Sequence, residues 1–341
     1  MSGESLVIGV DGGGSTTRAA LVDAIGRVLG LGYAGPSNYD DVGVGVAEEN
    51  IGRAVSAAWH ATGQAFRPAD AAFFGMAGVV SDADRAAIRG MARALDIAPA
   101  ECVGVDHDIR IALAGGLGGR EGIALIVGTG SSCYGRRADG RAWRAGGWGY
   151  LLDDLGGGYY LGLHGLIALT RAADGRGVAT ALTEPLLAAL RLTDPQDIMH
   201  RLYHAGLDGS SGGMTRADIA TLAPLVLDAA IAGDAVATEI VERGVDELAL
   251  MVATVARALE FDAAGATVTA VGGLAQSGAA FKQWLYPAIR RRAPRADIVE
   301  PALSPVLGAA LLALEMCGVA PSDAVIERLR RPCEDDDRRM E

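Results

Sequence analysis

The segment VIGVDGGGSTTRAALVD (residues 7–23) decides the fold. A β-branched apolar run leads into three glycines and three hydroxyl residues, and an alternating run follows. This pattern predicts two strands joined by a glycine hairpin. Such a hairpin leaves backbone N–H groups unobstructed, and its hydroxyls can donate to phosphate oxygens. We therefore predict a phosphate-binding loop made of Gly12, Gly13, Gly14, Ser15, Thr16 and Thr17.

Asp11 ends the first of these strands. There it is placed to hold a magnesium ion through water, because Mg²⁺ keeps much of its hydration shell. The loop is neither a P-loop nor a dinucleotide-binding turn, since it lacks Gly-Lys-Ser/Thr and a strand follows it. The alternative is a plain glycine hairpin that needs positive φ. Three hydroxyls after three glycines exceed what such a turn requires, so we favour phosphate binding.

A second glycine-and-hydroxyl segment, GTGSS (128–132), also stands between two predicted strands. Alone it is a weak signal, but paired with the first it predicts two hairpins that hold the phosphates from opposite domains. Thr129, Gly130 and Ser131 are its predicted phosphate ligands. Gly272 and Gly273 follow the strand ATVTA (266–270) and could let backbone lie flat against an adenine ring. The alternative for them is a strand-to-helix turn before a helix over 276–292.

The order of predicted elements begins again in the second half of the 341-residue chain. The first half is expected to contain a strand meander (6–35), a helix (42–62), a strand (71–77), a helix (82–95) and a strand (101–106). A short helix then leads to the glycine run 115–119, which we expect to mark a domain joint. The chain from 155 to 259 is mostly helical, and a last helix is expected over 305–316.

This organisation predicts a doubly wound α/β protein of two domains with a cleft between them. The first domain is expected to span residues 1–116 and to be completed by helices within 305–330. The second is expected to span residues 117–304 and to contain a helical insertion.

Composition excludes several classes of protein. The net charge is −12 and no basic stretch with interleaved aromatics occurs, so nucleic-acid binding is not expected. Four scattered cysteines suit a reducing compartment and indicate neither a disulfide framework nor a zinc site; they are Cys102, Cys133, Cys317 and Cys333. No signal-peptide layout and no apolar run of about 18 residues is present. We therefore expect a cytoplasmic protein with no membrane partner.

Taken together, these motifs resemble the BadF/BadG/BcrA/BcrD ATPase family, and within it the N-acetylglucosamine kinases of the sugar kinase/Hsp70/actin superfamily. The matching segments keep the family's order and are VIGVDGGGSTTRAALVD (7–23), GPSN (35–38), ECVGVDHD (101–108), IALIVGTGSSCYG (123–135), DGRAWRAGGWG (139–149), the loop with Asp154, AVGGLA (270–275) and SPVLGAALLA (304–313). The resemblance implies an actin/hexokinase-like (ribonuclease H-like) fold with ATP in an interdomain cleft. It also implies ATP and Mg²⁺ as cofactors and a homodimer.

The resemblance assigns roles to individual residues. From the residues alone, Asp108 reads equally as a catalytic base and as an N-cap for the helix that follows; the resemblance favours the base. It also implies that Asn38 and Asp154 hydrogen-bond the sugar, with Gly130 and Ser132 completing that site. The chain departs from the family pattern on both sides of Asp108 (His107-Asp108-Ile109), after Asp154 (Leu155-Gly156-Gly157), and at Ser132, where amino-sugar kinases often carry Asn.

The expected activity is an ATP-dependent phosphorylation of the 6-hydroxyl of an amino sugar, N-acetylglucosamine or glucosamine. N-acetylmannosamine and glucose are rival acceptors. An alternative function is an ATPase that activates a partner enzyme of the acyl-CoA reductase or dehydratase type. A sugar sensor without catalysis is a third, against which the intact Asp11 and Asp108 argue.

Overall fold

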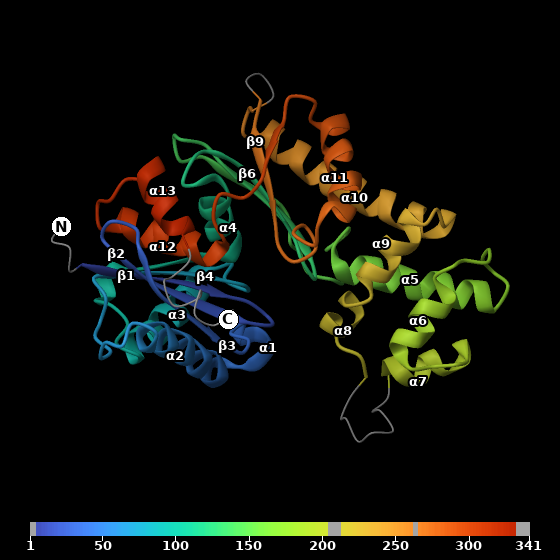
Figure 1. Ribbon diagram of the computed structural model, residues 1–341, viewed down its shortest axis with the longest axis horizontal. Helices are drawn as coiled ribbons and strands as arrows, with labels where there is room; N and C mark the ends of the chain where they lie inside the picture. The colour runs from blue at the N-terminus through green and yellow to red at the C-terminus, as the bar shows by residue number, and fades with distance from the viewer. Residues whose placement is uncertain (1–4, 204–212, 262–264, 332–341) are drawn as a thin grey trace. The chain divides into compact units, whose positions relative to one another are not determined.

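The computed structural model describes residues 5–203, 213–261 and 265–331 (Figure 1). The chain divides into two compact units, which we call unit 1 (residues 1–124 and 300–341) and unit 2 (residues 125–299). Each unit is built around one five-stranded mixed sheet flanked by helices. Cys333 lies outside the described residues, and the other three cysteines are free thiols.

The sheet of unit 1 has the strand order β3-β2-β1-β4-β5. Its strands are β1 (Leu6–Gly12), β2 (Thr17–Asp23), β3 (Val28–Ala34), β4 (Ala71–Met76) and β5 (Val103–His107). The first three form the predicted antiparallel meander, and β4 and β5 add to β1 in parallel. The carboxyl ends of β1, β4 and β5 therefore meet at one edge of the sheet.

Helices cover both faces of this sheet (Figure 1). They are α1 (Tyr39–Val42), α2 (Val44–His60), α3 (Asp82–Ala94), α4 (Asp108–Leu117), α12 (Pro305–Met316) and α13 (Asp323–Arg330), with a 3₁₀ turn at Ala100–Cys102. Successive strand residues point to opposite faces, so Ile8 packs with the α2 and α3 side chains whereas Val7 packs with those of α12 and α13. Both faces are apolar, which explains the nearly unbroken apolar sequence of β1.

The sheet of unit 2 repeats the topology of the first. Its strands are β6 (Gly122–Val127), β7 (Ser131–Arg136), β8 (Ala142–Gly146), β9 (Thr267–Val271) and β10 (Asp297–Val299). Their order is β10-β9-β6-β7-β8, in which the first strand of the unit is again central, with the meander on one side and two later strands on the other. The repeat of architecture predicted from the sequence is therefore present.

A helical segment separates β8 from β9 in unit 2. The helices of this unit are α5 (Gly158–Ala173), α6 (Thr183–Leu190), α7 (Ile198–Tyr203), α8 (Arg216–Ala220), α9 (Ala223–Ile231), α10 (Ala235–Ala258) and α11 (Ala279–Arg292), with a 3₁₀ turn at Pro195–Asp197. The long helix α10 packs against β7 and β8. Within the described ranges no single helix is long and apolar enough to cross a membrane, although one pair bent by 117°, 216–231 with 235–258, passes that test jointly.

Three expected boundaries differ from the structure. The helix expected over 42–62 is interrupted at Gly43, whose φ is 81°, so α1 and α2 are separate. The helix expected from 276 begins at Ala279. The glycine run expected at a joint instead begins inside α4, where α12 crosses closely: a Cβ on Gly308 would lie 2.4 Å from the Gly115 amide nitrogen. These glycines allow two helices to approach, and the unit boundary falls later, within β6.

Candidate nucleotide and sugar site

The first predicted phosphate loop, residues 11–17, joins β1 to β2 and is called hairpin 1 below. None of its three glycines adopts positive φ. A Cβ on Gly12 would lie 2.3 Å from the Met76 methyl carbon, but Gly13 and Gly14 have no neighbour closer than 3.5 Å to an added Cβ. The backbone conformation therefore does not demand these glycines, against the plain-hairpin alternative. Gly14, Ser15 and Thr16 are exposed, as a loop that meets a ligand requires.

Thr17 has a different environment from the rest of hairpin 1. Its side chain is fully buried; the hydroxyl donates to the Gly35 carbonyl at 2.7 Å and lies 2.7 Å from the Ser37 hydroxyl. The Gly13 carbonyl in turn accepts hydrogen bonds from the backbone of Ser37 at 3.0 Å and Asn38 at 3.2 Å. Hairpin 1 and the loop that carries Asn38 are thus one hydrogen-bonded assembly.

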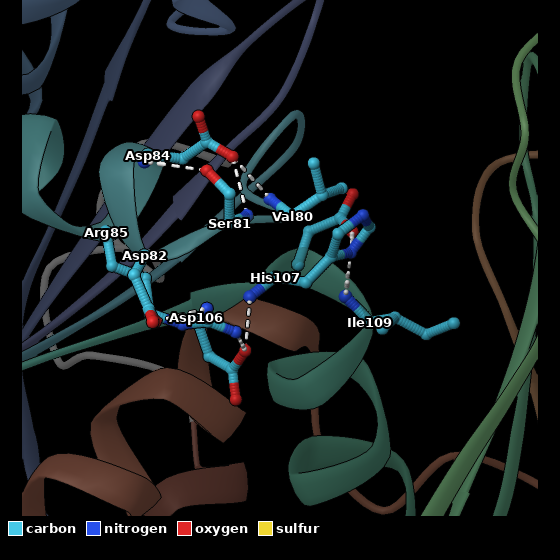
Figure 2. Close-up of polar contacts among 9 residues, drawn as sticks. Val80, Ser81, Asp82, Asp84, Arg85, Asp106, His107 and Ile109 are labelled. Carbon is cyan, nitrogen blue, oxygen red and sulfur yellow. Dashed lines mark hydrogen bonds and ion pairs between the residues drawn. The ribbon is translucent and has the colours of Figure 1, made fainter.

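Asn38 is held by its own hydrogen bond and by that of the next residue. Its Nδ2 donates to Asp41 at 2.7 Å, while its Oδ1 is buried and has no hydrogen-bond partner among the described residues. The next residue, Tyr39, donates its hydroxyl to Asp84 at 2.6 Å, and Asp84 also forms the capping box of α3 with Ser81 (Figure 2). Burial and the hydrogen bond to Asp84 raise the pKa of Tyr39 to about 12. The Asn38 loop is therefore anchored to α3.

Asp11 lies near the end of β1 and Asp108 directly follows β5, at the same edge of the unit 1 sheet. Burial, followed by the negative charge of Asp108, raises the pKa of Asp11 to about 6. Arg18, its register partner on β2, opposes this shift from 3.4 Å. The negative charge of Asp108 therefore acts on the Asp11 carboxyl, and the sheet edge carries two carboxylates.

Asp108 is the first residue of α4, and His107 is the N-cap of that helix. The Ile109 N–H lies 3.3 Å from His107 Nδ1, and the same Nδ1 lies 2.5 Å from Asp108 Oδ1 (Figure 2 shows His107 and Ile109). The N-cap interpretation of Asp108 is therefore wrong, because its neighbour has that role. Asp106 accepts the His107 N–H at 2.8 Å and lies 3.4 Å from Arg85.

The second predicted phosphate loop, residues 128–132, is called hairpin 2. The Asp154 carboxylate closes it: Oδ1 accepts from the Ser131 N–H at 3.1 Å, and Oδ2 lies 3.4 Å from the Arg216 guanidinium. Asp154 is only 5 % exposed and has φ 63°, an uncommon conformation that Asp tolerates better than most residues. A Cβ on Gly130 would lie 2.4 Å from this carboxylate. The structure therefore brings Gly130, Ser131 and Asp154 together.

Some of the remaining polar groups of hairpin 2 have hydrogen-bond partners in the protein, and one does not. The Ser131 hydroxyl donates to the Leu155 carbonyl at 2.8 Å, and the Thr129 carbonyl accepts from Tyr159 at the start of α5 at 2.9 Å. Ser132 is buried, and its hydroxyl has no hydrogen-bond partner among the described residues. The Ser131 hydroxyl thus stabilises hairpin 2 through a hydrogen bond, whereas the Ser132 hydroxyl is available to a ligand.

The two glycines after β9 differ from each other. Gly272 has φ 101°, and a Cβ there would lie 2.6 Å from the Val127 carbonyl, so the backbone itself requires this glycine. The same carbonyl accepts from the Leu274 and Ala275 N–H groups, both at 3.1 Å. Gly273 is exposed with nothing near its would-be Cβ. The strand-to-helix turn therefore explains Gly272. It does not explain Gly273, where the backbone has space beside it for a ligand.

Three residues that support this site have no predicted role. Ser37 lies in the GPSN segment beside Asn38, and His107 is a departure from the family pattern. Arg216, which pairs with Asp154, is 62 positions away from it in the chain and has no local signal.

Two mixed sheets of the same topology, each with a glycine-and-hydroxyl hairpin after its first strand, define the two-domain actin- and hexokinase-like class of α/β proteins. A model of the BadF/BadG/BcrA/BcrD ATPase family matches residues 8–313, and the chain belongs to that family. The family and fold predicted from the sequence are thus confirmed.

Similar proteins carry related names. An N-acetylmuramic acid/N-acetylglucosamine kinase of Clostridium acetobutylicum is 32% identical over 91% of this chain and 99% of its own length. An N-acetyl-D-glucosamine kinase of Dictyostelium discoideum is 28% identical over 91% of this chain and 98% of its own. A crystal structure from Chromobacterium violaceum, described as a candidate N-acetylglucosamine kinase, has a TM-score of 0.72 at 30% identity, covering 91% of this chain and 99% of that one.

Proposed function

We propose that this protein is an ATP-dependent kinase that phosphorylates the 6-hydroxyl of an amino sugar, N-acetylglucosamine or glucosamine. Family membership supports the use of ATP. The names of both curated relatives support an amino sugar as acceptor, and the bacterial relative adds N-acetylmuramic acid as a sugar to be tested.

One observation carries the assignment of the sugar residues. Asn38 Oδ1, Ser132 Oγ and Asp154 Oδ2 are buried and have no hydrogen-bond partner among the described residues, although Asp154 has its ion pair. A buried polar group without a partner costs about 1–3 kcal/mol, so such groups are expected where a ligand supplies the partner. A pyranose, with its ring of hydroxyl donors, is such a ligand.

The same criterion selects few other groups in the described part of the chain. They are Asp108 Oδ1, which lies against His107, and side-chain atoms of Trp59, Thr269 and Trp284. Three of the four side chains proposed for the sugar thus have such an atom available to a ligand, because Asp108 Oδ1 lies against His107. The family motifs and the buried atoms without hydrogen-bond partners thus select the same residues. Together they support the proposal more strongly than either does alone.

In the proposed reaction, Asp108 orients the 6-hydroxyl and accepts its proton as the oxygen attacks the γ-phosphorus; the bond from the γ-phosphorus to the bridging oxygen breaks, and ADP leaves. Backbone N–H groups and the exposed hydroxyls of Ser15 and Thr16 hold phosphate oxygens from hairpin 1. Thr129 and Gly130 do so from hairpin 2. Gly273 offers the open backbone for the adenine. The buried Thr17 and Ser131 hydroxyls, which have protein partners, act by holding their loops.

Asp11 fits a role in holding Mg²⁺. A carboxylate whose pKa is raised by burial and by a second carboxylate gains from a nearby cation. The described residues contain no cluster of three or more acidic, histidine or cysteine side chains suited to a metal. Mg²⁺ needs none, because it binds through one or two carboxylates, waters and substrate phosphates. The ion would neutralise charge on the phosphates.

The direct test is an assay of ADP release with a panel of sugars: N-acetylglucosamine, glucosamine, N-acetylmannosamine, glucose and N-acetylmuramic acid. We expect an amino sugar to stimulate release well above the rate with ATP alone, and ³¹P NMR to show a 6-phosphate. If no sugar raises ADP release above the sugar-free rate, the proposal fails.

A pair of variants tests the sugar site itself. Ser132→Ala removes one hydrogen bond to the sugar and should raise its KM about three- to tenfold with little change in the KM for ATP. Thr269→Val is the matched control, because Thr269 also has a buried, unpartnered hydroxyl but lies within β9 and is not a proposed contact. Equal effects of the two substitutions would contradict the assignment of Ser132.

A cytoplasmic location and a homodimer belong to the same proposal. A kinase works where ATP is available, and the three described cysteines are free thiols, which suits a reducing compartment. The homodimer follows from the family resemblance. The alternative of an ATPase that activates a partner enzyme has less support, since both curated relatives are named as sugar kinases.

A further inference from the structure

We propose that His107 is a positioning residue for Asp108: its Nδ1–H donates to Asp108 Oδ1 and thereby leaves Oδ2 to face the acceptor hydroxyl. This inference rests on the proposed function, because it assumes that Asp108 is the base.

The contact between the two side chains requires a proton. His107 Nδ1 lies 2.5 Å from Asp108 Oδ1, a buried atom with no hydrogen bond to any other described residue. Bare nitrogen and oxygen lone pairs at this separation repel, so a hydrogen must lie between them. A neutral imidazole has its one N–H on either Nδ1 or Nε2, and the Nδ1 tautomer supplies that hydrogen.

A second group competes for the same nitrogen. The Ile109 N–H approaches Nδ1 at 3.3 Å as the N-cap bond of α4, and that bond needs Nδ1 without a hydrogen. One nitrogen cannot donate and accept at once. The cap bond is longer than a good N–H hydrogen bond, and a buried carboxylate oxygen without a donor costs more than a neutral helix-start N–H without an acceptor. The geometry therefore favours donation to Asp108.

The backbone of His107 is itself held in place. Asp106 Oδ1 accepts the His107 N–H at 2.8 Å, and Arg85 of α3 lies 3.4 Å from the same oxygen (Figure 2). The imidazole therefore projects from a fixed strand end. A fixed ring can hold the neighbouring carboxylate in one rotamer, which is what a base aligned with a hydroxyl requires.

Two substitutions separate positioning from capping. Ser and Asn are comparable N-caps, so the two variants do not differ in their ability to cap α4 from position 107. Asn can place an amide N–H where Nδ1 stands, whereas the Ser hydroxyl is shorter. We expect His107→Ser to lower kcat about 10- to 100-fold with the sugar KM changed less than about twofold, and His107→Asn to restore most of the rate. Equal kcat values in the two variants would overturn the proposal.

Ser322→Ala is the control for loss of helix stability. It removes the N-cap hydrogen bond to Val325 in α13, so it should lower Tm and leave kcat unchanged. A loss of kcat in His107→Ser at a Tm equal to that of His107→Asn then reports on Asp108 and not on folding.

A readout without turnover keeps this inference separate from the proposed function. The chain has five histidines, so ring ¹⁵N spectra of the wild type and His107→Asn identify the His107 signals by difference. We expect a hydrogen on Nδ1; a hydrogen on Nε2 with bare Nδ1 would overturn the proposal. If no sugar stimulates ADP release, the function fails while the spectra still decide the tautomer.

Discussion

Hairpin 1 and hairpin 2 stand at the same place in two sheets of the same topology, yet they are held in different ways. Hairpin 1 is fixed through the Gly13 carbonyl and the buried Thr17 hydroxyl, so its tip stays exposed. Hairpin 2 is closed around a carboxylate, Asp154, which binds the Ser131 N–H. Hairpin 1 also contains Asp11, whose pKa is raised by burial and by the charge of Asp108. From this difference we expect the reacting groups to lie at hairpin 1 and hairpin 2 to be the more rigid of the two proposed phosphate-binding loops.

The largest effect is expected from a carboxylate exchange in each unit. Asp108→Asn should lower kcat about 10²- to 10⁴-fold with the Kd for ATP unchanged, because a proton acceptor is lost and no phosphate contact is touched. Asp154→Asn keeps an oxygen for Ser131, and Asn tolerates positive φ, so its kcat should fall less than about tenfold. Turnover and calorimetric ATP binding check both. A comparable loss in the two variants would remove the division of roles.

The second prediction concerns pH and Asp11 in the protein without nucleotide or metal. Because the folded-state pKa is raised from 3.8 to about 6, the folded state binds the proton more tightly than the unfolded chain. The stabilisation is therefore complete below about pH 4 and is lost as pH rises through 6. Between pH 4 and pH 7, Asp11→Asn should gain about 2–3 kcal/mol over the wild type.

Urea unfolding of both proteins across this range, in the presence of a chelator, measures the difference. Parallel stability curves for the wild type and Asp11→Asn would show that Asp11 is not destabilised by its surroundings. Hairpin 1 would then lose the electrostatic feature that distinguishes it from hairpin 2.

The third prediction compares one glycine from each hairpin. Gly130→Ala places a methyl group 2.4 Å from the Asp154 carboxylate and should lower the free energy of unfolding by about 1–3 kcal/mol. Gly13→Ala meets its nearest neighbour at 3.5 Å and adopts no positive φ, so its stability should change by less than about 0.5 kcal/mol. Denaturant midpoints at constant slope test this, and equal losses would indicate that both hairpins are equally closed.

The smallest change in stability is expected for substitutions of two neighbouring threonines in hairpin 1. Thr17→Val leaves the Gly35 carbonyl and the Ser37 hydroxyl without their partner and should cost about 1–2 kcal/mol of stability. Thr16→Val, at an exposed position, should leave stability within about 0.5 kcal/mol but raise the KM for ATP. Thermal unfolding with steady-state kinetics distinguishes them. Loss of stability in both would mean that the exposed tip is also structural.

Local patterns were sufficient to predict much of the fold. The alternation in β1 and β2 and the apolar run of α12 lie within single elements, and the bounds of α12, Pro305–Met316, are as predicted. The end of α4 was not predictable, because the need for glycine at 115 comes from the close approach of α12. Propensity within a segment does not contain that information.

The candidate site also has features that local sequence predicts and features that depend on the fold. Glycine and hydroxyl motifs are local, so both hairpins could be found from the sequence. The partners that hold them are not local: Asp154 reaches Ser131 across 23 positions, and only the fold brings Arg216 to Asp154. The cap at His107 was missed because Asp108 is the commoner capping residue of the two.

Unit 1 is interrupted in the sequence by the whole of unit 2, and this has a consequence for biosynthesis. Val7, Ala20 and Val22 on one face of its sheet are covered by α12 and α13, and β1 approaches α12 so closely that a Cβ on Gly9 would lie 2.3 Å from the Ala310 nitrogen. At about 5–20 residues per second, a ribosome needs tens of seconds to travel from β3 to α12. During that time the apolar face of the nascent sheet lacks its covering helices, so we expect a chaperone to bind it.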